Sequence, residues 1–165
     1  MLQKLKNRFA KKKIILCVSG SIAAYKACEL IRDLREEGAS VTCVMTGSAQ
    51  KFVTPLTLKA LSANPVYVDP FSSEADWAVL HTTLADEADL ILVCPASANV
   101  IARLACGMAD DLVTSVVLAS RAKVLIVPAM NDNMYAHPMT QENIAKLRKI
   151  YHFIDPIKEI GRAHV

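Results

Sequence analysis

Apolar and polar positions along the chain form two alternating patterns. Compact apolar runs bounded by turn residues are typical of buried strands, and amphipathic stretches between them are typical of helices. The predicted strands are residues 13–20, 40–46, 66–69, 89–97 and 123–130, with 151–155 as a candidate last strand. The predicted helices are residues 21–38, 54–63, 81–87, 99–107, 111–120 and 140–150. Residues 69–77 are polar and turn-like, which indicates an exposed loop.

This alternation predicts a single α/β domain, a doubly wound, Rossmann-like parallel sheet with helices on both faces and right-handed crossovers. The stretch 89–97 is almost wholly apolar, as expected of a central strand that is covered on both faces. Ligands of such sheets bind outside the carboxyl ends of the strands. We therefore expect a site among the loops 19–23, 46–52, 95–99 and 128–135.

Composition and charge narrow the class of protein. The chain has 165 residues, of which 53% are hydrophobic, enough for one substantial core. No apolar run approaches the roughly 18 residues of a membrane span, so we expect a soluble protein without a membrane partner. The net charge of +3 is too weak to indicate a nucleic-acid partner. Residues 1–12 are basic and lead into a turn instead of a cleavage site, which favours a solvated extension over a signal peptide.

The cysteines and histidines give no sign of a metal. Five cysteines occur without a C-x-x-C pair, mostly inside apolar runs, which favours free thiols in a reducing cytoplasm. Cys106 continues an apolar helical face, so we expect it in the core. The four histidines lack metal-ligand spacing.

The first loop is a candidate anion site. Gly20 and Ser21 stand between a strand and the start of a helix, where free backbone N–H groups favour a phosphate. An N-capped helix after a tight turn explains the same residues equally well. The fingerprint G-x-G-x-x-G is absent, and the second strand ends at Thr46 without an acidic residue for a ribose. A mononucleotide therefore fits better than NAD.

The third and fourth loops carry short polar side chains. Ser97 and Asn99 follow a buried strand, where they could reach a heteroaromatic ring or simply cap the next helix. Asn131 and Asn133 lie among methionines and are poor core material, which indicates a site at the mouth of the sheet.

Three further side chains have two interpretations each. His81 suits proton transfer near neutral pH, yet a histidine packed on a helix face is the simpler explanation of that residue alone. Trp77 and Tyr135 could stack on a ring or cover the edge of the sheet.

Four motifs in this order resemble those of a known family. They are G-S-I-A-A-Y-K at residues 20–26, His81, P-A-S-A-N with A-x-G-x-A-D-D-L within residues 95–112, and P-A-M-N-x-x-M at residues 128–134. Together they resemble the homo-oligomeric flavin-containing cysteine decarboxylases, over residues 13 to about 156.

The resemblance implies a flavoprotein fold that binds FMN and assembles as trimers, with the active site at a subunit interface. It implies His81 as the acid/base group, and Asn131 as the partner of the substrate carboxylate, supported by Met134. The cofactor contacts that it implies are Gly20, Ser21, Ile22, Thr46, Ser97 and Asn99.

Within the family, the resemblance is to members that convert 4'-phosphopantothenoylcysteine to 4'-phosphopantetheine in coenzyme A biosynthesis, with the flavin as electron sink. A peptide-cysteine decarboxylase, a regulatory flavoprotein and a flavin prenyltransferase stay open as alternatives. A non-catalytic nucleotide-binding module is supported by the fold class alone.

The sequence departs from the family at two places. Tyr135 stands where many members carry tryptophan, a mild change between aromatic residues. The family's decarboxylases also have a cysteine-containing substrate clamp that this chain lacks. We expect the decarboxylase domain to span residues 13–159, and residues 160–165 to be a non-native tail that resembles translated adapter sequence. The natural protein would then continue into the clamp and a ligase domain.

Overall fold

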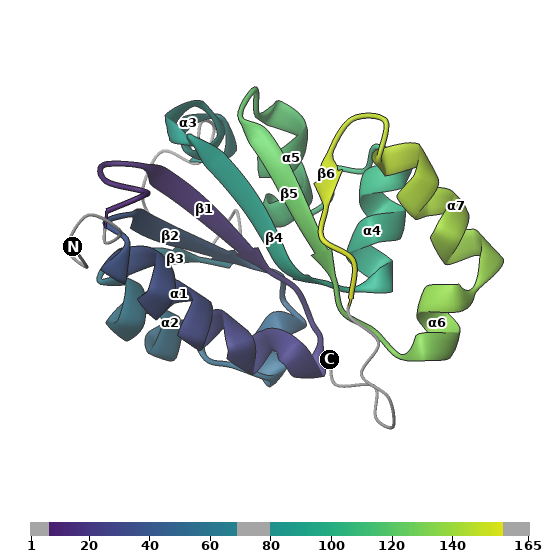
Figure 1. Cartoon of the computed structure of the whole chain (residues 1–165), viewed down its shortest axis with the longest axis horizontal. Helices are drawn as coiled ribbons and strands as arrows, with labels where there is room; N and C mark the ends of the chain where they lie inside the picture. The colour runs from purple at the N-terminus through teal and green to yellow at the C-terminus, as the bar shows by residue number, and fades with distance from the viewer. Residues whose placement is uncertain (1–6, 69–79, 157–165) are drawn as a thin grey trace.

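The computed structural model describes residues 7–68 and 80–156, which form one parallel sheet with helices on both faces (Figure 1). The predicted loop 69–77, with Trp77, lies outside the described residues. The strand order is β3-β2-β1-β4-β5-β6, and every pair is parallel. The strands are β1 (Lys13–Val18), β2 (Ser40–Met45), β3 (Val66–Tyr67), β4 (Leu90–Ala96), β5 (Lys123–Pro128) and β6 (His152–Phe153). The predicted fold class is confirmed.

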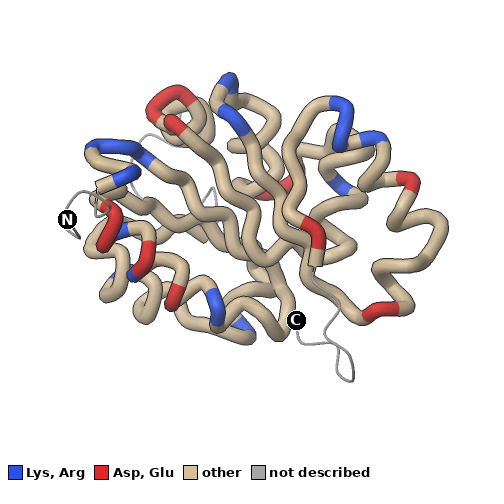
Figure 2. Tube along the Cα trace, viewed as in Figure 1, with Lys and Arg blue, Asp and Glu red and all other residues tan. Residues whose placement is uncertain are grey.

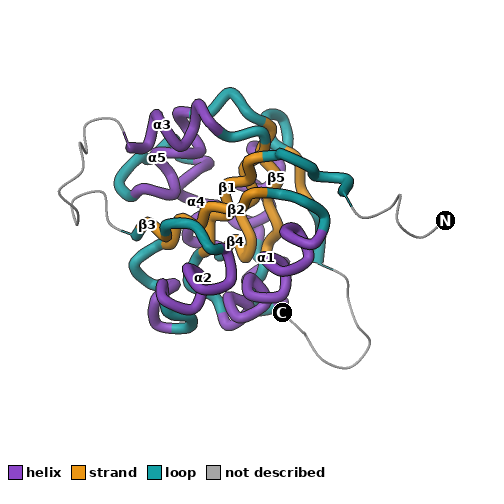
Figure 3. Tube along the Cα trace, turned by 90° about the vertical axis from the view of Figure 1, so that its left-hand side faces the viewer, coloured by secondary structure: helices purple, strands orange, loops and turns teal. Residues whose placement is uncertain are grey.

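The helices divide between the two faces of the sheet, as the end-on view shows (Figure 3). On one face lie α1 (Lys26–Glu36) and α2 (Pro55–Ser62). On the other lie α3 (Leu80–Glu87), α4 (Ala98–Ala105), α5 (Leu112–Ala119) and α7 (Pro138–Leu147). The short α6 (Asp132–Ala136) connects β5 to α7, and two 3-10 turns, η2 (Ile22–Tyr25) and η3 (Ala49–Lys51), follow β1 and β2.

The continuous apolar run of β1 is explained by burial on both faces. Successive side chains of a strand point to opposite sides. Accordingly Ile14 and Leu16 join the hydrophobic cluster under α1 and α2, whereas Ile15 and Cys17 join the cluster under α3, α4 and α5. All four are at most 3% exposed, so β1 is anchored from both sides and its carboxyl end is a rigid support for a site.

The strand order reverses between β1 and β4, where a crevice opens in doubly wound sheets. The chain leaves β1 toward β2 on one side, and it leaves β4 toward β5 on the other. Regular pairing of the two strands runs from Ile14 with Leu90 to Cys17 with Val93. Beyond this pair the regular register ends, and the loops 19–23 and 95–99 begin.

Four details differ from the sequence prediction. The first predicted helix is split, because η2 precedes α1 and only α1 is α-helical. The predicted loop 128–135 contains α6, and α7 begins at Pro138 with His137 as N-cap, before the predicted residue 140. Cys106 is exposed, so its assignment to the core was wrong. It is the C-cap of α4, where the apolar face has already ended.

Residues 7–12 of the basic extension contact α1 and the turn that follows it. The Phe9 backbone N–H donates to the Glu37 carbonyl over 2.9 Å, and the Arg8 guanidinium pairs with the Glu37 carboxylate over 3.0 Å. The hydrogen bonds from Arg8 lower the pKa of Glu37 to about 2. Among the helices of the described residues, none has the length and apolarity that crossing a membrane requires.

Candidate functional site

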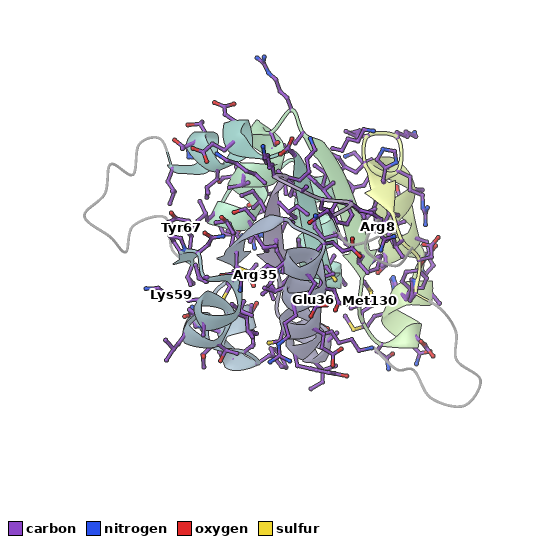
Figure 4. The ribbon with its side chains drawn as sticks, turned by 60° about the vertical axis from the view of Figure 1, so that its left-hand side comes forward. Arg8, Arg35, Glu36, Lys59, Tyr67 and Met130 are labelled. Atoms are coloured by element: carbon purple, nitrogen blue, oxygen red, sulfur yellow. The ribbon has the colours of Figure 1, made fainter. Side chains whose placement is uncertain are left out.

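A cavity of about 520 Å³ opens at the carboxyl ends of β1, β4 and β5. Met130, labelled in Figure 4, lies two residues after the end of β5 and forms part of the cavity wall. The residues that line the cavity come from all four loops that the sheet topology predicted, which confirms that these loops converge. They are Gly20, Ser21, Ile22, Ser48, Phe52, Ser97, Ala98, Asn99, Ala129, Met130, Asn131 and Met134.

Gly20 and Ser21 of the first loop contact the second and fourth loops at close range. A Cβ atom added to Gly20 would lie 2.4 Å from Ser48 Oγ, a distance that side chains do not tolerate. The Ser21 hydroxyl accepts from the Ala23 backbone N–H over 3.3 Å and donates to the Ala129 carbonyl over 3.2 Å. Ser21 therefore caps η2, as the simpler interpretation held, and also ties the β1 loop to the β5 loop.

The third loop brings the start of a helix to the cavity wall. Ser97 is the N-cap of α4, and its hydroxyl accepts from the Val100 N–H over 3.3 Å. The first turn of a helix has N–H groups without partners inside the helix, and here that turn includes Ala98 and Asn99 of the cavity lining. This end of α4 can receive hydrogen-bond acceptors and partial negative charge.

The fourth loop fixes the direction of one amide group. The Asn131 Oδ1 atom accepts from the Asn133 backbone N–H over 2.9 Å, which makes Asn131 the N-cap of α6. With Oδ1 engaged in this way, the Nδ2 group is the part of the side chain that can donate to a ligand. Met134, on α6, is 50% exposed and adds an apolar side chain to the wall.

The cavity is uncharged and combines apolar side chains with short polar ones. Among the described residues that line it, none carries a charged side chain. Figure 2 shows charged residues at the opposite edge, around the amino ends of β1, β4 and β5, and others along α1 and on α6. Lys12 and Lys13 pair there with Asp89 and Glu87 over 2.9 and 3.0 Å. A ligand of the cavity would be recognised by hydroxyl, amide and backbone N–H groups.

Four predicted residues do not line the cavity in the described chain, namely Thr46, His81, Asn133 and Tyr135. Thr46 is 4% exposed and lies below the wall, where its hydroxyl hydrogen-bonds with Ser48 Oγ at 3.0 Å. His81 is half-buried at the start of α3, on the face of the sheet opposite α1. Tyr135 packs against the core and donates its hydroxyl to Asp155 over 2.9 Å, so it covers the sheet.

Several residues at or near the cavity, including Ser19, Ser48 and Phe52, were not predicted as site residues. Ser48 and Phe52 line the cavity. An aromatic residue within a loop that was predicted to border the site could have identified Phe52 from the sequence, and its side chain is exposed in the structure. Ser19 is buried behind the cavity, and nothing in the sequence distinguishes this serine from an ordinary turn residue. Cys94, near the end of β4, packs against the hydrophobic cluster under α1 and α2, and burial raises the pKa of its thiol to about 11. Cys94 therefore stays protonated at neutral pH and is a poor nucleophile.

Comparisons with known proteins agree on one family. The sequence model of the Flavoprotein family matches residues 2–165. The chain is 50% identical over 146 residues to the "Coenzyme A biosynthesis bifunctional protein CoaBC" of Bacillus subtilis, a match that covers 88% of this chain and 36% of that protein. It therefore spans about a third of that relative's length.

Two further matches cover most of both chains. The chain is 50% identical over 148 residues to the "Probable phosphopantothenoylcysteine decarboxylase" of Streptococcus mutans, covering 88% of this chain and 83% of the relative. Among solved structures, the FMN-dependent cysteine decarboxylase SpaF superimposes with a TM-score of 0.84 at 29% identity, over 92% of this chain and 88% of SpaF.

Proposed function

Because this chain belongs to the Flavoprotein family, we propose that it binds FMN in the cavity at the carboxyl ends of β1, β4 and β5. We further propose that it is a carboxy-lyase that converts 4'-phosphopantothenoylcysteine to 4'-phosphopantetheine, a step of coenzyme A biosynthesis. The observation that carries the proposal is the convergence of the four loops on one uncharged cavity. The chain is also 50% identical in sequence to a protein named for this decarboxylation.

The residues of the cavity suit a flavin. Ile22, Phe52 and Met130 offer apolar surface for a flat ring, while the hydroxyl and amide groups suit the polar edge of that ring. Gly20 lets two loops approach each other without a side chain between them. The first turn of α4 would receive oxygen atoms of the cofactor, whereas the Ser21 hydroxyl already donates to the Ala129 carbonyl and would contact the cofactor as an acceptor. We keep Gly20, Ser21, Ile22, Ser97 and Asn99 as proposed FMN contacts, and Thr46 through its support of Ser48.

The protein's own contribution to the reaction is binding, orientation and proton transfer. FMN held by these residues would supply the two-electron redox chemistry that lets the cysteine end of the substrate lose carbon dioxide. The Asn131 Nδ2 group would donate to the substrate carboxylate, because its Oδ1 atom is already held by the N-terminus of α6. Met134 would shield this contact from water. His81 is our proposed acid/base group.

We also propose a homo-oligomer, a trimer or an assembly of trimers. His81 lies outside the cavity of its own chain, so a second copy would have to supply it. Apolar side chains are available for such a contact, because Ile22 and Met134 of the cavity lining and Leu56 of α2 are 64%, 50% and 76% exposed. A cytoplasmic location is proposed as well, since all five cysteines are free.

The test is to identify the chromophore and then the reaction. The purified protein should show oxidised-flavin absorbance and release a compound with the mass of FMN on denaturation. Incubation with 4'-phosphopantothenoylcysteine should release carbon dioxide, and a peptide that ends in cysteine should react far more slowly. A protein that stays colourless after incubation with FMN would refute the proposal. Preference for the peptide would leave the cofactor in place and overturn the substrate.

A further inference from the structure

We propose that Ser19 is a positioning residue of the cofactor site, and that its hydroxyl sets the place where α4 begins. This inference rests on the proposed binding of FMN in the cavity. Ser19 does not line the cavity itself. It acts through Ser97, whose backbone and side chain start the helix that forms one wall.

The Ser19 side chain joins two strands where their regular pairing has ended. Hydrogen-bonded register between β1 and β4 stops at Cys17 and Val93. Two residues further along, the Ser19 hydroxyl donates to the Pro95 carbonyl over 2.7 Å and accepts from the Ser97 N–H over 2.8 Å. The backbone N–H of Ser19 reaches the same Pro95 carbonyl over 3.2 Å. One side chain thus takes the place of a strand partner.

The sequence explains why a side chain is needed at this point. Proline has no N–H group, so Pro95 cannot donate to a neighbouring strand. The pairing of β4 with β5 is also irregular between Val93 and Ala96, so the end of β4 is held less regularly on that side as well. Ser19 is 1% exposed, which means that water cannot readily replace its hydroxyl as the partner of Ser97.

The bond to Ser97 controls the geometry of the wall. Ser97 N–H is held by Ser19, and Ser97 Oγ in turn accepts from the Val100 N–H. The intervening residues, Ala98 and Asn99, both face the cavity. If the Ser19 hydroxyl is removed, the Ser97 N–H loses its acceptor, and the first turn of α4 is free to shift relative to Ser21 on the opposite side.

Ser62 provides a matched control. Its hydroxyl is also buried, at 2% exposure, and it also accepts from one backbone N–H and donates to one carbonyl, both belonging to Asn64. Ser62 ends α2 and does not line the cavity. A purely structural loss of a buried hydroxyl should therefore look the same in Ser19→Ala and Ser62→Ala.

The experiment compares Ser19→Ala, Ser19→Thr and Ser62→Ala with the unaltered protein. We expect Ser19→Ala to raise the Kd for FMN at least tenfold and to shift the visible circular dichroism of the bound flavin, and Ser19→Thr to retain binding. Ser62→Ala should leave the Kd and the spectrum unchanged. Unchanged FMN binding in Ser19→Ala, or an equal loss in Ser62→Ala, would overturn the inference.

A second measurement does not depend on the cofactor. In the flavin-free protein, amide hydrogen exchange at Ser97 should accelerate at least tenfold in Ser19→Ala and stay unchanged in Ser62→Ala. If the unaltered protein fails to bind FMN, the proposed function falls while this measurement still reports on Ser19. If the unaltered protein binds FMN but exchange at Ser97 is unaffected by Ser19→Ala, the role of Ser19 falls and the proposed function stands.

Discussion

Asn131 performs a structural task and a proposed chemical task with different atoms. Oδ1 caps α6, and Nδ2 is free to donate. Replacing Asn131 by aspartate keeps an oxygen for the cap but exchanges the donor for a negative charge. We expect Asn131→Asp to fold normally and to lower kcat/KM for 4'-phosphopantothenoylcysteine at least tenfold, about 1.4 kcal/mol, because like charges oppose each other. Steady-state release of carbon dioxide measures this.

Asn133→Asp is the control for that substitution. It makes the same chemical change two residues away, on a side chain that is exposed and does not line the cavity. Its negative charge also lies in the first turn of α6, where it is tolerated. Equal losses in the two variants would remove Asn131 from its proposed role and leave only a general effect of charge on this loop.

Gly20 is required by close packing between two loops. In Gly20→Ala the new methyl group would collide with both Ser48 Oγ and Ser48 Cβ, at 2.4 and 2.6 Å. We expect FMN affinity to fall at least tenfold as the two loops move apart. The double variant Gly20→Ala with Ser48→Gly removes both colliding atoms and should recover most of the affinity in a fluorescence titration. Failure of the second substitution to help would show that Gly20 is needed for another reason.

At the scale of elements, the start of α5 is secured by Asp111. Its carboxylate accepts from the Thr114 N–H over 2.8 Å, and the Thr114 hydroxyl accepts in turn from the Asp111 backbone N–H. Arg103 of α4 pairs with the same Asp111 carboxylate over 2.7 Å. Replacing Asp111 by alanine removes the cap and the ion pair together. We expect the free energy of unfolding in urea to fall by about 2 kcal/mol.

Two further variants separate the cap from the ion pair. Asp111→Asn keeps an acceptor for Thr114 and should lose less than Asp111→Ala. Asp110 is the other partner of Arg103, and the Asp110 side chain is 50% exposed. Asp110→Ala should therefore lower the free energy of unfolding by less than about 1 kcal/mol. A loss in Asp110→Ala equal to that in Asp111→Ala would assign the stability to the ion pairs and not to the helix cap.

The elements were predictable from the sequence because their burial is simple. A strand covered on both faces reads as a continuous apolar run, so residues 89–97 identified β4 (Leu90–Ala96) almost to the residue. The short α6 was missed because its capping residue, Asn131, and its methionine follow no helical period. Cys106 was misplaced because helical periodicity continues past the residue where α4 ends.

The site was predictable at the level of loops and not of side chains. Sheet topology fixes which loops meet, and all four contribute to the cavity. Whether Thr46 faces the cavity or lies below Ser48 depends on the turn at η3, which the sequence does not encode by any periodic pattern. The role of Ser19 depends on contacts 76 and 78 residues away in the chain.

At the scale of the whole molecule, the placement of His81 makes a prediction about assembly. If each site combines Asn131 of one chain with His81 of another, two inactive variants can complement each other. We expect His81→Ala and Asn131→Asp to be nearly inactive alone, and their co-expressed mixture to regain up to about a quarter of the full activity in a cyclic assembly with random mixing. Separately purified proteins assayed without subunit exchange are the control.

Absence of recovery in mixed oligomers would contradict the shared site. It would place His81 either within the site of its own chain or outside the reaction. Mass spectrometry of the intact assemblies would first establish that both variants are present in one particle, so that a negative result has a single meaning.

The two outer strands of the sheet, β3 (Val66–Tyr67) and β6 (His152–Phe153), contain only two residues each. Such short edges offer another chain almost no row of open backbone groups to pair with. Copies of this protein therefore cannot readily join by extending one sheet into the next. Among the described residues, the helices and loops are then the surfaces that association would use, and the same short edges disfavour growth of this apolar sheet into fibrils.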